Sequence, residues 1–160
     1  MTINYSNDNY TLDINFHTDE NCKYYNELKL KVRNKNDELI FKCSYNADYF
    51  SNAMCLTYLS LIGENHKITD IIEQEIYDER EYMLIDYSHN ETDGWAVNIY
   101  SMSVNQMLTC ILLQTEDDCK FIIQSLRHAI YSQYSKDIND LRDEYDKVFN
   151  SNSNEEFDEN

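Results

Sequence analysis

A strict alternation of apolar and polar residues early in the chain most constrains what it can fold into. Apolar side chains recur at every second position in residues 11–16, 27–33 and 38–45. A period of two turns one set of side chains toward a core and the other toward solvent, as in a half-buried β-strand. The connector at residues 34–37, Asn-Lys-Asn-Asp, has the composition of a turn. The sequence therefore predicts a three-stranded antiparallel meander in this region.

The period then changes from two to that of a helix. Apolar residues between Phe50 and Leu61 fall on one broad helical stripe, which predicts a helix over 47–62. Asn46 is positioned to be its N-cap and Gly63 to end it. We expect this helix to be buried on much of its circumference.

The crossover that follows is less regular. Residues 64–80 carry isoleucines at a spacing of four among many acids. This pattern fits either a short helix after Thr69 or an irregular crossover, and both interpretations stay open.

Strand patterns return in the second half of the chain. Residues 81–88 and 95–99 alternate around the turn sequence Asn-Glu-Thr-Asp-Gly, which predicts a hairpin. Residues 107–113 are apolar on both faces, which is typical of a central strand. A helix is then expected from residue 116, because apolar residues spaced by three and four follow three acids that suit a helix N-terminus.

The two halves share one plan of three strands and a helix. The units cover 11–63 and 81–134. Two explanations stay open: a duplication, and a common plan that recurred without shared descent. We predict a single α+β domain over 1–149, with about six mostly antiparallel strands in one sheet and two helices packed on one face. A C-terminal amphipathic helix over 136–149 either is separate or continues the preceding helix past a bend, and the polar tail 150–160 is expected to be disordered.

The composition excludes several kinds of catalytic or metal site. The chain has no proline and two glycines, so it cannot build a glycine-rich phosphate loop or a Gly-x-Ser-x-Gly nucleophile turn. No Cys-x-x-Cys occurs, and the four histidines lack the close spacing of zinc ligands. We therefore expect no cofactor, no metal and no enzymatic activity.

The cysteines point to a reducing compartment. Their number, five, is odd, and no basic-then-apolar leader opens the sequence. No apolar run reaches the roughly 20 residues that span a bilayer. We expect a cytoplasmic protein that does not bind membranes, with Cys119 packed as a thiol rather than acting as a nucleophile, since Glu116 to Asp118 oppose its ionisation.

Negative charge is the main functional signal. The formal net charge is −17, and residues 68–160 hold 21 acidic and six basic residues while residues 1–67 hold nine and seven. This excess is greater than the roughly two to eight net charges that keep a small domain soluble. Twelve carboxylates are the candidate partner-binding residues: Asp70, Glu73, Glu75, Asp78, Glu79, Glu116, Asp117, Asp118, Asp137, Asp140, Asp143 and Glu144.

A surface this acidic repels nucleic acid and attracts basic proteins. We therefore expect a non-catalytic inhibitor that docks on the basic cleft of a nuclease or another nucleic-acid-binding enzyme. An immunity protein or antitoxin, and a phage anti-defence protein that mimics nucleic acid as anti-CRISPR proteins do, both fit this expectation. The alternative is an adaptor or scaffold module whose binding does not depend on charge. Pairing of open strand edges into a homodimer also stays open.

Overall fold

Seven strands and three helices follow one another in the order β1–β4, α1, α2, β5–β7 and α3. The computed structural model describes residues 2–18, 21, 26–76, 81–102 and 106–158, with side chains from 106–108 and 151–158 outside the described set. The α+β class predicted from the sequence is confirmed.

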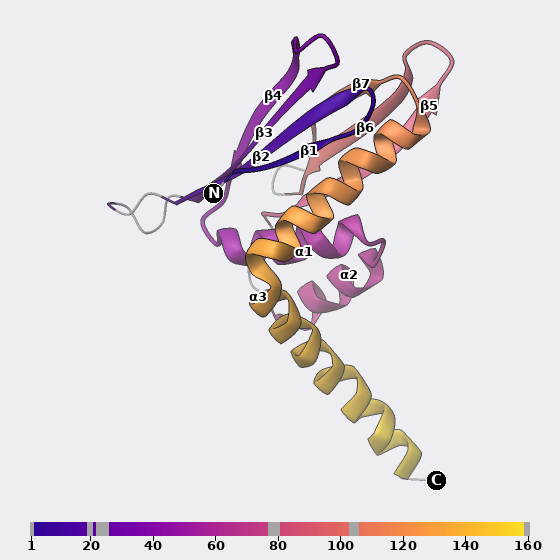
Figure 1. Cartoon of the computed structure of the whole chain (residues 1–160). Coiled ribbons are helices and arrows are strands. Elements are labelled where there is room, and N and C mark those ends of the chain that lie inside the picture. The colour runs from indigo at the N-terminus through magenta and orange to yellow at the C-terminus, as the bar shows by residue number, and fades with distance from the viewer. Residues whose placement is uncertain (1, 19–20, 22–25, 77–80, 103–105, 159–160) are drawn as a thin grey trace.

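The first four strands form one antiparallel sheet in chain order (Figure 1). They are β1 (Thr2–Ser6), β2 (Tyr10–Thr18), β3 (Asn26–Asn34) and β4 (Leu39–Asn46). The three predicted strands of the meander are confirmed, and β1 is an addition. The short β1 pairs with β2 along its whole length, so its formation depends on the neighbouring strand as well as on its own alternation.

The other three strands form a second antiparallel sheet, so the expectation of one continuous sheet was wrong. They are β5 (Met83–Asn90), β6 (Gly94–Ser101) and β7 (Gln106–Leu113). The predicted hairpin joins β5 and β6. The prediction that 107–113 is a central strand was also wrong, because β7 lies at the sheet edge and Leu112 is 53% exposed.

The helices differ from the predictions mainly at their ends. α1 spans Phe50–Leu61, and Tyr49 is its N-cap residue, so Asn46 is the last residue of β4 instead of a cap. Gly63 has a φ of 79° and follows the end of the helix as expected. α2 spans Asn65–Glu73, which resolves the crossover as a helix that begins before Thr69.

α3 spans Glu116–Asp158 and bends at Tyr134, where φ is −123° and ψ is 23°. The C-terminal amphipathic segment is therefore a continuation of α3 past a bend, one of the two alternatives that the sequence left open. In Figure 1 the second half of α3 runs away from both sheets toward the C-terminus. The disorder expected of 150–160 stays a prediction.

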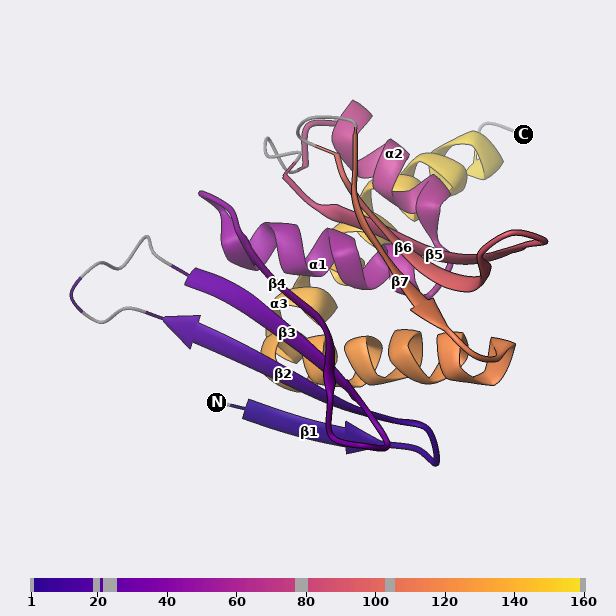
Figure 2. The same ribbon diagram turned by 90° about the horizontal axis from the view of Figure 1, so that it is seen from above.

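The core joins both sheets through α1 and the first half of α3. α1 packs against α3 and β5, and α3 also contacts β2, β6 and β7 (Figure 2). Met54 and Leu56 of α1 and Ile122 and Leu126 of α3 are completely buried. Burial of each such side chain stabilises the fold by about 1.5–3 kcal/mol. β2–β4 with α1 and β5–β7 with α3 follow the expected strand-strand-strand-helix order, β1 and α2 are additions in the first half, and common descent of the halves stays a prediction.

In the part of the chain that is described, none of the helices combines the length and apolar character required to cross a membrane.

Candidate functional site: an acidic helical surface and a basic sheet face

Four of the predicted carboxylates lie on the second half of α3. Ile138 and Leu141 turn this segment's apolar face toward the core, and both are buried. The acids occupy the exposed remainder of its circumference, and they are Asp137, Asp140, Asp143 and Glu144. Asp137 also accepts a hydrogen bond of 2.7 Å from Ser51 Oγ, which ties this segment to the start of α1.

Three more predicted carboxylates belong to α2 or follow it directly. Asp70 is half-buried, whereas Glu73 and Glu75 are exposed. The Tyr145 hydroxyl donates a hydrogen bond of 3.0 Å to Asp70 Oδ2, which places the end of α2 beside the second half of α3. Burial raises the pKa of Tyr145, and its hydrogen bond to Asp70 raises it further.

A mixed-charge cluster supports the same contact between α2 and α3. Glu64 Oε2 lies 3.2 Å from Lys67 Nζ and 4.0 Å from an Arg142 amino nitrogen. Lys67 also lies over the Tyr145 ring, and Arg142 lies over the Tyr58 ring, each at 5.4 Å from the centroid. The cations at this junction are therefore directed inward to aromatic rings and to Glu64, and the exposed carboxylates lie around it.

We call these seven carboxylates the acidic helical surface: Asp70, Glu73, Glu75, Asp137, Asp140, Asp143 and Glu144. They come from two segments that are distant in the chain, and the contact between Asp70 and Tyr145 brings these segments to one junction. Asp78 and Glu79 lie outside the described residues.

The acids at the start of α3 are not part of this surface. With a rise of about 1.5 Å per residue, they lie roughly 35 Å along the helix from Asp140. Asp117 is exposed, while Glu116 forms an ion pair of 3.3 Å with Lys120 and accepts a hydrogen bond of 3.2 Å from Tyr87. The structure thus separates two groups that the sequence-based prediction treated as parts of one site.

Asp118 has a structural role at the helix start. It is only 2% exposed, and its carboxylate accepts hydrogen bonds from the Thr115 backbone N–H and from the side-chain amides of Asn7 and Asn9. Its own N–H donates to Thr115 Oγ1, so the two residues form a reciprocal cap. Asp118 is therefore not available to a partner on the surface.

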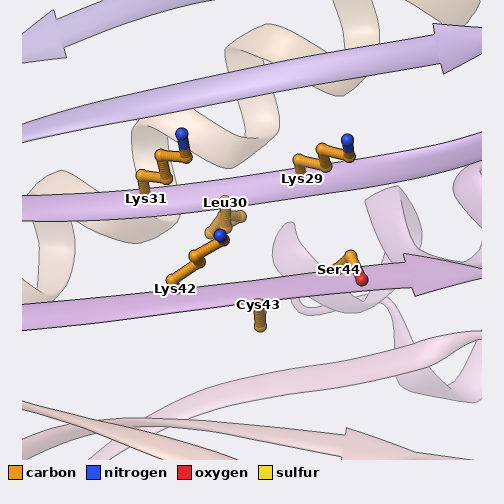
Figure 3. Close-up of a pocket in the computed structure, with 6 residues that line it drawn as sticks. All are labelled: Lys29, Leu30, Lys31, Lys42, Cys43 and Ser44. Atoms are coloured by element: carbon orange, nitrogen blue, oxygen red, sulfur yellow. The ribbon is translucent and has the colours of Figure 1, made fainter.

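The outer face of the first sheet has the opposite charge. Lys29 and Lys31 of β3 and Lys42 of β4 project from it, and Figure 3 shows the three side chains on the side of the strands away from the helices. They line a hollow of about 350 Å³ together with Ser44. An adjoining hollow of about 330 Å³ shares Lys29 and Lys31, and it also contains a carboxylate, because Asp13 of β2 is the cross-strand partner of Lys31. The alternation of residues 27–33 places Lys29 and Lys31 on one face of β3, whereas the hollows depend on the pairing of four strands.

A groove lined by both apolar and polar residues, the latter including Asn34 and Gln114, separates the edges of the two sheets. Its volume is about 390 Å³, and β4 contributes Ile40 and Phe41 while β7 contributes Cys110, Ile111 and Leu112. Ile40 is 41% exposed and Leu112 is 53% exposed. Both strands end their sheets, so each offers an open backbone edge to solvent.

The thiols and imidazoles form no further site in the described residues. Burial, then the charges of Asp118 and Glu116, raise the pKa of the Cys119 thiol to about 11, so it is protonated at neutral pH as a packed side chain. No group of three or more metal-binding side chains occurs in the part of the chain that was searched.

Comparisons with protein family models, with curated proteins and with solved structures gave no match to this chain. The functional argument therefore depends on the geometry and charge of the surfaces described above.

Proposed function

We propose that this protein is a non-catalytic inhibitor that acts in the cytoplasm by docking its acidic helical surface on the basic cleft of a nucleic-acid-handling enzyme. The two biological settings are an immunity protein or antitoxin against a nuclease toxin, and a phage anti-defence protein that mimics nucleic acid. The observation that carries this proposal is the row of exposed carboxylates on the half of α3 that extends away from the sheets.

The spacing of these carboxylates suits a phosphate-binding cleft. Asp137, Asp140 and Glu144 follow one another at three and four residues, or about 4.5 and 6 Å along the helix axis. Phosphates of one DNA strand advance by about 3.4 Å along the duplex axis, which is a distance of the same order. A cleft lined with lysine and arginine for phosphates can therefore pair with this row.

The net charge of −17 also supports a cationic partner, because of its effect on stability and on association. Carboxylates this dense repel one another and destabilise the compact state, and a cationic partner relieves that repulsion on binding. Charge complementarity also raises the rate of association, most strongly at low salt.

The test measures inhibition of a panel of purified nucleases, including toxin nucleases and RNA-guided nucleases, at 50 and 500 mM salt. The variant Asp137→Asn/Asp140→Asn/Asp143→Asn/Glu144→Gln removes four charges from the acidic helical surface. The matched control, Asp8→Asn/Asp37→Asn/Glu91→Gln/Asp117→Asn, removes four charges from exposed positions elsewhere.

Wild-type protein should inhibit at least one enzyme of the panel, more strongly at low salt. The α3 variant should lose about thirtyfold in potency, as expected when four rim charges each contribute about 0.5 kcal/mol. The control should change potency by less than about threefold. Equal potency of the α3 variant and the wild type would contradict the proposal.

The groove between β4 and β7 favours a second candidate, an adaptor that binds an extended segment or a second copy by its strand edges. Exposed Ile40 and Leu112 are the residues on which this candidate depends. The double variant Ile40→Ser/Leu112→Ser should abolish adaptor binding and leave charge-dependent inhibition intact. The α3 variant with four carboxylates replaced by amides should lose charge-dependent inhibition and keep adaptor binding.

A further inference from the structure

Two lysines of the first sheet are direct neighbours across strands. Lys31 of β3 and Lys42 of β4 are directly opposite cross-strand partners, an arrangement in which like charges repel. Lys29 has an ion pair of 3.1 Å with Glu27. Among the described residues, no carboxylate forms an ion pair with Lys31 or Lys42. Asp13 of β2 is the cross-strand partner of Lys31 on its other side, without an ion pair to it, so Lys42 is the ammonium group farthest from a carboxylate on this face. An anion from outside the chain can contact both ammonium groups.

The hollow beside them has the dimensions of a small-ligand site. Residues two apart on a strand are separated by roughly 6.6 Å, and neighbouring strands by about 4.8 Å. Lys29, Lys31 and Lys42 therefore surround a hollow of about 350 Å³, with the Ser44 hydroxyl opposite Lys29. Figure 3 shows their ammonium nitrogens on the same face of the sheet. Three flexible point charges at this spacing can contact successive phosphate groups of one ligand.

The surroundings select a short phosphate chain over a nucleic acid strand. Among the described residues that alternate onto this face of β1–β4, none is Phe, Tyr or Trp, and His17 is the aromatic ring present, so successive bases lack a row of stacking partners. The net charge of −17 also repels a long polyanion. A small ligand lies within about 8–10 Å of the three lysines, where their local charge is least screened.

We propose that the face formed by Lys29, Lys31 and Lys42 binds the di- or triphosphate group of a small ligand. The lysines recognise the phosphate chain itself, which can be part of a nucleotide or of free polyphosphate. This site lies on the outer sheet face, away from the acidic helical surface, and its existence does not depend on the proposed inhibitor function.

Isothermal titration of the full-length chain with sodium tripolyphosphate, ATP and AMP, in 20 mM salt with EDTA, tests this proposal. Tripolyphosphate and ATP should each bind one site, and AMP should bind at least tenfold more weakly. ATP binding that is tighter than tripolyphosphate binding would identify a nucleotide as the source, and the reverse order would identify free polyphosphate. Binding of AMP as tight as that of ATP would overturn the proposal.

The variant Lys31→Gln/Lys42→Gln should weaken tripolyphosphate binding at least tenfold. The matched control Lys136→Gln/Lys147→Gln removes two exposed lysines from α3 and should bind within about twofold of wild type. The sheet variant removes the repulsion between Lys31 and Lys42 together with the attraction between Lys31 and Asp13, so its melting temperature without ligand should stay close to that of the wild type. The assignment would be overturned if both variants lost the same affinity for tripolyphosphate, or if the sheet variant bound it like the wild type. Binding of hexaglutamate as tight as that of tripolyphosphate would also overturn it.

Discussion

The hydroxyl of Tyr145 donates a hydrogen bond of 3.0 Å to Oδ2 of Asp70, and these residues are 75 positions apart in the chain. This bond attaches α2 to the half of α3 that carries the acidic row. Two acidic segments that are distant in sequence therefore meet at one junction.

Replacing Tyr145 by Phe removes this bond and keeps the ring that Lys67 covers. The free energy of unfolding should fall by about 0.5–1.5 kcal/mol, the net contribution of one hydrogen bond. Urea denaturation of Tyr145→Phe, Asp70→Ala and the double variant completes a cycle that isolates the pair. Additive losses in the double variant would show that the two side chains do not interact.

Asp118→Ala should be far more destabilising than the same change at the neighbouring acid. It removes the reciprocal cap with Thr115 and leaves the amides of Asn7 and Asn9 without their acceptor. We expect a loss of about 2–3 kcal/mol in the free energy of unfolding. Asp117→Ala, at an exposed position, should change it by less than about 0.5 kcal/mol. Similar losses in both variants would contradict the structural role of Asp118.

Stability should decrease in alkaline solution because of Cys119. Burial raises its pKa in the folded chain to about 11 from an ordinary 9.0. A raised pKa favours the protonated folded state, so this contribution is complete below about pH 9 and is lost as the pH rises toward 11. Cys119→Ala should flatten the decrease in unfolding free energy between pH 9 and 11 measured by urea denaturation. A variant as steep as the wild type would exclude Cys119 as a source of the decrease.

Gly63→Ala should destabilise the protein through backbone conformation alone. Gly63 has a φ of 79°, and a Cβ built there would meet no atom within 4 Å. We expect a loss of about 1 kcal/mol in unfolding free energy, because a left-handed conformation is unfavourable for alanine. Gly63→Asn should lose less, since asparagine tolerates this region better. Thermal denaturation of both variants gives the comparison, and equal losses would argue against a conformational cause.

Local patterns in the sequence predicted most of the elements and their faces. Alternation in 27–33 already separated the buried Leu30 from Lys29 and Lys31, since a period of two is a property of the strand itself. The apolar stripe after residue 116 likewise predicted the buried face of α3. The density of acids in the second half was visible from composition.

Tertiary structure decided which of these elements meet. Strand pairing divided the strands into two sheets, left Leu112 at an open edge and opposed Lys31 to Lys42. Chain packing also buried Asp118 and joined Asp70 to Tyr145. Periodicity specifies the direction of a side chain relative to its own strand or helix, but contacts between distant segments depend on how whole surfaces pack. The sequence therefore specified the charges, whereas the fold divided them among an acidic helical surface, a helix cap and a basic sheet face.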